Sequence, residues 1–265
     1  MQSHYSYQST LAASERIGWK VEDLIGGDKK LDFAKPFMPE SLAQVKQLSF
    51  LTPQEQLTLN QIRGHEYLSM FGLVEEFILP YVIDHARPQL SGDDYRVRAL
   101  LQFAGEEAKH IHLFKRFRQE FDESFGSKCD FIGAAREVSR YVLSHSPLGI
   151  GIAILHIEWI TLRHYIEGVK DNQDLDPQFK SLLKHHWLEE SQHTKLDTLI
   201  VDEVVANSAP EQINQAFEEY AEIGGFIDNG LKQQAELEVE SFVGATGREL
   251  SRNQRQELGA AVLKG

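Results

Sequence analysis

Apolar residues recur every three or four positions along most of the chain after residue 52, which is the spacing of one face of an α-helix. No stretch of any length shows the strict alternation of polar and apolar residues that marks a half-buried strand. The pattern therefore predicts an all-α fold. Long helices are expected over residues 53–85, 93–121, 147–169 and 177–206, and their lengths suit an antiparallel four-helix core.

Capping residues mark three of the expected helix starts. Residues 52–55 read Thr-Pro-Gln-Glu, which is a capping box with proline at the first helical position. Residues 176–177 read Asp-Pro, an N-cap followed by proline. Ser208 and Glu211 predict a second capping box, which would begin an additional helix that reaches residue 241.

The remaining segments have weaker patterns. Residues 131–144 predict a shorter helix that ends before Pro147. The first 51 residues contain glycine and proline with scattered aromatics, so we expect an irregular arm with a short helix near residues 42–48. No linker rich in Gly, Pro or Ser divides the chain, which predicts a single domain over residues 1–265. Its expected parts are an arm (1–51), a helical bundle (52–206), an additional helix (207–243) and a loose or lightly helical tail (244–265).

Composition and charge exclude several classes of protein. The 265 residues are 42% hydrophobic and 10% aromatic, which is enough for a buried core and excludes global disorder. The single cysteine, Cys129, leaves no internal disulfide or all-cysteine metal site and fits a reducing, cytoplasmic setting. A net charge of −13 argues against nucleic acid as a partner. The polar residues 1–10 are not expected to be a signal peptide, and the longest apolar stretch, 147–157, is too short to span a membrane.

Two copies of one short motif carry the candidate chemistry. Glu107 and His110 form a Glu-x-x-His motif in one predicted helix, and Glu190 with His193 forms a second motif in another. Residues three positions apart lie on the same helical face, so each carboxylate and imidazole can hold one metal ion. Both motifs lie on the apolar side of their helices, where solvated charges do not belong.

The two other long helices offer the additional carboxylates that a dimetal site needs. Glu158 lies in an otherwise nearly uncharged stretch, and Glu75 and Glu76 lie among apolar residues. A buried carboxylate costs several kcal/mol unless it is paired or bound to metal. The order of the groups also repeats, because Glu75 precedes Glu107, and Glu158 precedes Glu190, by 32 positions. The chain therefore resembles two copies of a helix pair, each of which supplies the ligands typical of dimetal bundles.

Several roles near the motifs remain alternatives. Helical phase favours Glu75 over Glu76 as the ligand, whereas a helix twisted at Pro80 would present Glu76 instead. The first Glu of each Glu-Glu pair, Glu106 and Glu189, is interpreted either as solvent-facing or as a base beside the metal. Further along the second motif's helix, Asp197 shares the face of His193 and is a candidate acceptor for the other ring nitrogen of a ligand histidine.

His186 stands one turn before Glu190 on the same face. It is interpreted as a further ligand, and the alternative is a core histidine that donates to a carboxylate. Carboxylate and imidazole ligands without thiolate suit iron or manganese better than a structural zinc ion. The full set predicts two ions about 3.5–4 Å apart.

This ligand pattern resembles the ferritin-like diiron-carboxylate superfamily, over about residues 52–206. The third histidine makes it most similar to the p-aminobenzoate N-oxygenase family of diiron arylamine oxygenases. Phe114 departs from the radical tyrosine that ribonucleotide reductase small subunits carry one turn after the first motif histidine. The resemblance implies that the iron ligands are Glu75 or Glu76, Glu107, His110, Glu158, His186, Glu190 and His193.

The resemblance also implies a function. We expect a diiron oxygenase or oxidase that activates O₂ and oxidises a small organic substrate, with an amine as a candidate and a reductase or ferredoxin as electron donor. The alternatives are an iron-handling ferroxidase or store and a manganese–iron ligand-binding oxidase. The additional helices are expected either to enclose a substrate pocket or to form a homodimer interface. Gly149 and Gly151 are expected either to open space beside the metals or to allow close packing.

Overall fold

The computed structural model describes residues 5–133 and 135–265. Residues 1–4, at the start of the segment that is not expected to be a signal peptide, and residue 134, in the helix expected over 131–144, lie outside the described residues. Within the described ranges, every named element is a helix, which confirms the predicted all-α fold. None of these helices combines the length and the apolar character that crossing a bilayer requires.

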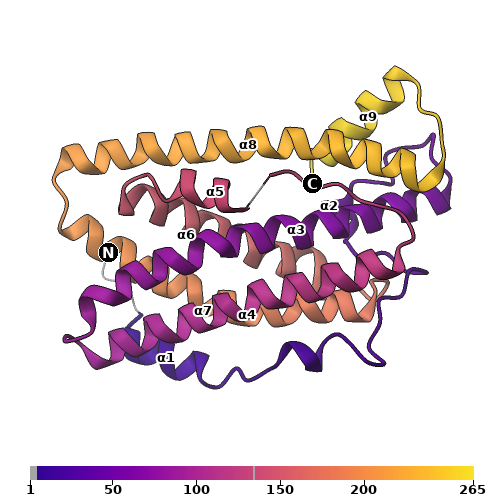
Figure 1. Ribbon diagram of the computed structural model, residues 1–265. Helices are drawn as coiled ribbons and strands as arrows, with labels where there is room; N and C mark the ends of the chain where they lie inside the picture. Colours follow the sequence, from indigo (N-terminus) through magenta and orange to yellow (C-terminus); the bar gives the residue numbers. More distant parts are fainter. Residues whose placement is uncertain (1–4, 134) are drawn as a thin grey trace.

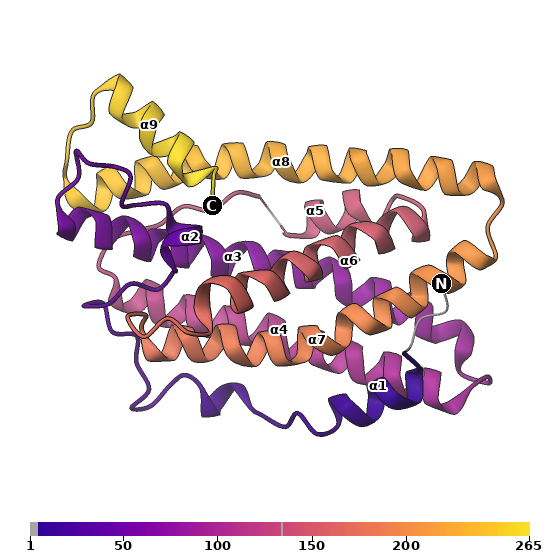
Figure 2. The same ribbon diagram turned by 180° about the vertical axis from the view of Figure 1, so that it is seen from behind.

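Four long helices form the body of the molecule. They are α3 (Pro53–Ala86), α4 (Asp94–Ser124), α6 (Pro147–His164) and α7 (Pro177–Ala206). Figures 1 and 2 show α3 lying beside α4 and α6 beside α7, and α4 also contacts α7 across the bundle. The four predicted helices are therefore present with boundaries that differ by a few residues, and the Pro80 ring is accommodated inside α3.

The capping chemistry accounts for two of the three predicted starts. Thr52 accepts a hydrogen bond from the amide of Glu55, and the Glu55 carboxylate accepts one from the amide of Thr52. At the start of α7, the side chain of Asp176 accepts a hydrogen bond from the amide of Phe179. The predicted capping box at Ser208 is wrong, because α8 (Pro210–Thr246) begins two residues later. Proline has no amide hydrogen and suits the first helical position, so Pro210 sets the start of this helix.

The helices outside the bundle cover one side of it. Figure 1 shows α8 running along the bundle as a long helix, and its contacts are with α3 and α6. The shorter α5 (Ala135–Val142) packs on α3 beneath it. The tail, expected to be loose or lightly helical, contains α9 (Arg252–Val262), which folds back on α8. Its apolar residues Leu258, Ala261 and Val262 are buried, and this contact stabilises a helix whose sequence is otherwise polar.

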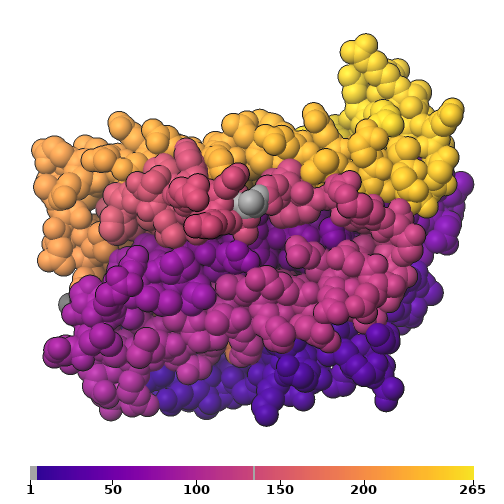
Figure 3. Space-filling model, in the orientation of Figure 1, coloured from indigo at the N-terminus to yellow at the C-terminus, as the bar shows by residue number. Residues whose placement is uncertain are grey.

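The N-terminal arm is more helical than its sequence pattern predicts. It contains α1 (Tyr7–Ser14), a 3₁₀ turn (Val21–Asp23) and α2 (Glu40–Ala43). The short helix expected near residues 42–48 lies earlier because Gln44 adopts a left-handed conformation, with φ of 54°, and ends it. Figures 2 and 3 show the first part of the arm following the side of the bundle opposite α8, where α1 contacts α4 and α7. The arm then turns, so that α2 lies beside α3 and near α9.

The two glycines of α6 serve close packing. A Cβ atom at Gly151 would overlap with the hydroxyl of Tyr81, and one at Gly149 would lie 2.9 Å from the Glu219 carboxylate. The structure thus decides against the alternative in which these glycines open space beside the metals. Beyond them, α6 continues into a π-helical turn, Tyr165–Val169, which ends at the predicted boundary.

Candidate metal centre

A layer of buried polar side chains interrupts the apolar core at the middle of the bundle. Along α4, Phe103 and Phe114 lie on either side of this layer, and along α7 Leu183 and Leu196 do the same. The layer contains carboxylates and imidazoles that are at most 3% exposed: Glu75, Glu107, His110, His186, Glu190 and His193. Three helices, α3, α4 and α7, therefore bring six of the predicted ligands together in the interior.

The ligand atoms form two groups of four. One group consists of Glu75, His110, His186 and Glu190. The other consists of Glu107, His110, Glu190 and His193. Within each group the atoms lie within 4.8 Å of one another. Glu190 belongs to both groups and has two oxygens, so it can bridge two ions. An imidazole nitrogen has one lone pair, so His110 can bind only one of them.

The hydrogen bonds that two histidines make through Nε2 turn the other ring nitrogen, Nδ1, toward the centre of the layer. His110 Nε2 lies 2.9 Å from Glu189 and His193 Nε2 lies 2.9 Å from Glu106. When these nitrogens donate, each Nδ1 presents a lone pair to the centre of the layer. There His110 Nδ1 faces a Glu190 oxygen at 3.2 Å, an arrangement of two acceptors that a cation would satisfy.

Charge also favours a pair of divalent ions. Within the described part of the chain, His110 Nδ1 and both Glu107 oxygens lack a hydrogen-bond partner although they are buried. Burial and the neighbouring Glu75 raise the pKa of Glu107 well above its usual range. Burial disfavours the charged form of His186, but Glu190 and Glu75 outweigh it and raise the pKa of this imidazole to about 9. Metal cations in place of these protons would neutralise the carboxylates, so the residues fit a dimetal centre.

The structure separates Glu75 from Glu76. Glu75 Oε1 lies 3.0 Å from His186 Nε2 inside the layer. Glu76 is half-buried on the outside of α3, and its carboxylate lies 3.0 Å from Lys115 Nζ on α4. Of the two alternatives, only Glu75 is placed among the other candidate ligands.

Glu158 is buried beside the layer but belongs to neither group of four. It is 1% exposed, and neither of its oxygens has a hydrogen-bond partner among the described residues. Burial and the nearby Asp197 carboxyl raise the pKa of Glu158 well above its usual range. Asp197 therefore faces Glu158, and the expectation that it accepts from a ligand histidine is wrong. The acceptor for His193 comes from the facing helix α4, because Glu106 lies directly across from it.

Glu106 and Glu189 are hydrogen-bonded to the candidate ligand histidines, so the alternative that they face solvent is wrong. Both are at most 3% exposed. Each carboxylate is hydrogen-bonded to the histidine of the other motif: Glu106 to His193, and Glu189 to His110. Burial favours the neutral acid, yet His193 and hydrogen bonds from Ser14 and Gln102 lower the pKa of Glu106 to about 2. The repeated Glu-Glu-x-x-His sequence is the signal for this crossed pair.

The N-terminal arm closes the outer side of this arrangement. The ring of Trp19 is nearly parallel to that of His110, with centroids 6.3 Å apart and an angle of 10°. Lys109 Nζ lies 4.0 Å from the centre of the Trp19 ring and pairs with Glu189. The arm has no helical periodicity at Trp19, so the sequence pattern gives no sign of this contact.

Replacing Glu189 by alanine is expected to weaken metal binding by about 10–100-fold, the usual effect of removing an outer hydrogen-bond partner of a ligand histidine. His110 would lose the acceptor that selects its tautomer. Titration of metal-free protein with Fe(II) or Mn(II) measures this effect. Glu123→Ala, which alters an exposed carboxylate on α4, is the control. Equal affinity in both variants would contradict the orienting role.

The comparisons with known proteins add evidence on the fold. No protein-family model and no curated protein matches the sequence. The structure is similar to an R2-like ligand-binding oxidase with an aerobically reconstituted Mn/Fe cofactor, at 15% identity and a TM-score of 0.55, over 100% of this chain and 91% of that chain. A mutant of such an oxidase with an Fe/Fe cofactor gives 15% identity and a TM-score of 0.55, over 99% of this chain and 92% of that one. A second mutant, which carries a Mn/Fe cofactor, gives 16% identity and a TM-score of 0.57, over 100% of this chain and 95% of that chain.

At such low identity these likenesses concern the fold. They agree with the predicted ferritin-like helical bundle. The more specific resemblance to p-aminobenzoate N-oxygenases stays a prediction.

Proposed function

We propose that this protein is a dimetal oxidase or oxygenase that uses O₂ to oxidise a small organic substrate. The observation that supports this most is the pair of overlapping ligand groups, in which the nitrogens of buried imidazoles face buried carboxylates. The structural neighbours are oxidases that carry Mn/Fe or Fe/Fe cofactors, which agrees with this donor set.

The proposed ligands are the six residues of the polar layer, with Glu158 as the carboxylate that α6 supplies. Two bound ions of iron, or of manganese and iron, would supply the electrons and the Lewis acidity for O₂ reduction. The protein holds the imidazoles in one tautomer through Glu106 and Glu189. It also excludes water, because the layer lies between two apolar parts of the core.

The reaction requires an electron donor in addition to the substrate. Full reduction of O₂ takes four electrons, and insertion of one oxygen atom into an organic molecule provides two. A reductase or ferredoxin is therefore part of the proposal. The third histidine, His186, supports the finer proposal of an N-oxygenase-like enzyme that acts on an amine.

Metal analysis combined with O₂ uptake tests the proposal. We expect the protein, loaded anaerobically with Fe(II) or with Mn(II) and Fe(II), to bind two ions per chain and to consume O₂ when it is exposed to air. Metal-free protein is the control. Binding of a single ion, or the absence of O₂ uptake by the loaded protein, would contradict the proposal. Oxidation of many Fe(II) ions per chain would favour an iron-handling protein instead.

A further inference from the structure

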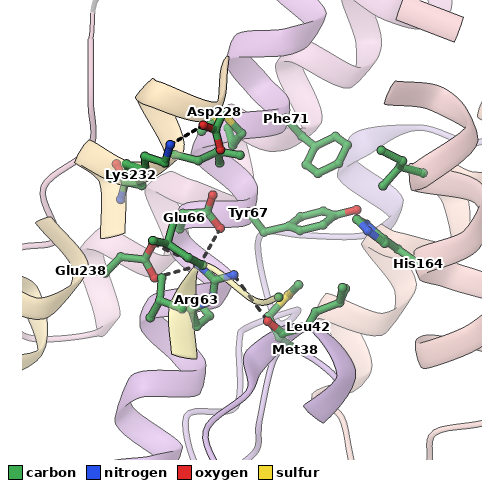
Figure 4. Close-up of a pocket in the computed structure, with 17 residues that line it drawn as sticks. Met38, Leu42, Arg63, Glu66, Tyr67, Phe71, His164, Asp228, Lys232 and Glu238 are labelled. Atoms are coloured by element: carbon green, nitrogen blue, oxygen red, sulfur yellow. Dashed lines mark hydrogen bonds and ion pairs between the residues drawn. The ribbon is translucent and has the colours of Figure 1, made fainter. Parts of the chain in front are cut away.

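A cavity of about 350 Å³ lies between the bundle and the helices α8 and α9, and one of its lining residues, Phe71, packs against His186 of the metal layer. Its walls come from α3, the end of α6, α8, the arm near α2 and the end of α9. Figure 4 shows this space, with the ring of Tyr67 extending across it toward the imidazole of His164. Apolar side chains make up much of the lining, among them Met38, Met70, Phe71 and Ile160. The size and the lining suit a molecule with one ring or a short chain.

The charged residues that line the cavity include three carboxylates, Glu66, Asp228 and Glu238, and two cations, Arg63 and Lys232. Arg63 Nη1 lies 3.1 Å from both oxygens of Glu238, and Arg63 Nη2 lies 3.4 Å from the carbonyl of Leu42. Glu66 approaches the same guanidinium only at 3.5 Å. Arg63 and Glu238 thus form a hydrogen-bonded pair that connects α3 to α8. Glu66 is the carboxylate beside Arg63 that lacks a hydrogen bond to it.

Glu66 is directed into the cavity without a hydrogen bond of its own among the described residues. It is 7% exposed, and Figure 4 shows its carboxylate above Arg63 in the open space. Burial raises its pKa, although Arg63 and His65 oppose this effect. Lys232, the other cation of the lining, pairs with Asp228. A buried carboxylate with an incomplete set of partners is costly, and a cationic ligand would complete it.

The imidazole of His164 does not repel such a ligand. Burial lowers the pKa of His164 to about 4, so the ring is neutral at neutral pH. Its Nδ1 is buried and has no hydrogen-bond partner in the described part of the chain. The faces of Tyr67 and Phe71 also attract organic cations.

Phe71 lines the cavity and also contacts the metal layer. Glu66 and Glu75 are nine residues apart, which is about 13 Å along a helix axis. Phe71 lies between them, one turn before Glu75, and its ring centre is 5.9 Å from that of His186. A molecule held at Glu66 would therefore place its other end beside Phe71, on the side of the metal ligands.

From this geometry we propose that the cavity binds a small organic cation, a primary amine with a single ring or a short chain, whose ammonium group pairs with Glu66. Its carbon end points past Phe71 toward the metal layer. If the proposed dimetal function holds, this amine is the substrate and is oxidised at the end remote from the ammonium group, so this inference rests on the dimetal oxidase function and not on its N-oxygenase-like form. An anionic ligand fits less well, because both terminal nitrogens of Arg63 are already engaged.

Ligand binding to the metal-free protein tests this proposal independently of O₂ chemistry. The probes are 2-phenylethylamine, its neutral counterpart 2-phenylethanol and the anion phenylacetate, measured by calorimetry at neutral pH. We expect the amine to bind at least about tenfold more tightly than the alcohol, the usual advantage of a charge-assisted hydrogen bond. Glu66→Gln should remove this preference, whereas Glu66→Asp should keep most of it.

Glu76→Gln is the matched control, because it changes a carboxylate on the same helix that pairs with Lys115 outside the cavity. Circular dichroism establishes that each variant is folded. Equal binding of the three probes, tightest binding of phenylacetate, or an unchanged amine preference in Glu66→Gln would each overturn the proposal. O₂ uptake by metal-loaded protein that fails to prefer the amine would leave the dimetal function intact and remove only this ligand.

Discussion

Replacing Glu190 by alanine is expected to reduce the metal content from two ions per chain to one or none and to abolish oxidative turnover. Glu190 is the carboxylate that belongs to both groups of ligand atoms together with His110. Its pKa is held well below the usual range, because the charges of His186 and His193 outweigh the effect of burial. It is therefore the ionised acceptor that faces all three histidines, and its removal takes one carboxylate from both groups of ligand atoms.

Metal analysis after anaerobic loading measures this effect, and Glu107→Ala provides a second test in the other motif. Glu76→Ala is the control, since this carboxylate lies outside the layer and pairs with Lys115. The control should retain two ions and its O₂ uptake. Two ions per chain in both Glu190→Ala and Glu107→Ala would show that the assignment of the centre is wrong.

Replacing His186 by alanine is expected to leave the fold and much of the metal in place while oxidative turnover falls by at least about a hundredfold. Removing a hydrogen-bond partner of a metal ligand usually lowers activity by about 10–100-fold, and removing a ligand itself should lower turnover at least as much. His186 Nε2 lies 3.0 Å from Glu75 and 3.2 Å from Glu190, so it points at the first group of ligand atoms. A neutral imidazole there would donate electron density to one ion and favour its oxidised state.

A purely structural role for His186 makes a different prediction. The side chain is 1% exposed and lies against the rings of Phe71 and Phe114. If packing were its only role, the variant would lose about 1–3 kcal/mol of stability and keep its optical spectrum and turnover. His185→Ala is the control, because this half-buried neighbour bonds to the carbonyl of Ser181. The absorption spectrum of the loaded protein in air, together with turnover, distinguishes the two roles.

The fold is predictable here to the extent that the pattern along each helix is strong. The four long helices have apolar faces and clear capping residues, and their limits follow from the sequence to within a few residues. The segments that differ are those in which tertiary contacts decide. Helix α9 depends on burial against α8, and α1 is a short polar helix that packs on α4 and α7. Such contacts leave no periodic signal in one sequence.

In the candidate metal centre, too, the local features follow from the sequence and the contacts between helices do not. Spacing along a helix places Glu107 beside His110 and Glu190 beside His193, because neighbours on one face are a local property. The partners across helices are not local, so the sequence pattern leaves two roles open for Glu106 and pairs Asp197 with the wrong neighbour. The contact of Trp19 with the centre depends on how the arm folds back over α4, and a linear pattern contains no information on it.

The crossed hydrogen bonds between the two motifs have a consequence for metal uptake. Glu106 on α4 holds His193 on α7, and Glu189 on α7 holds His110 on α4. A shift of either helix along the other would break both bonds at once, so the pair fixes the register of the two helices before any ion is present. The imidazoles are then preorganised in the protein as it folds. An incoming ion loses its water to ligands that already face it, and the conformational entropy of arranging them has been lost during folding.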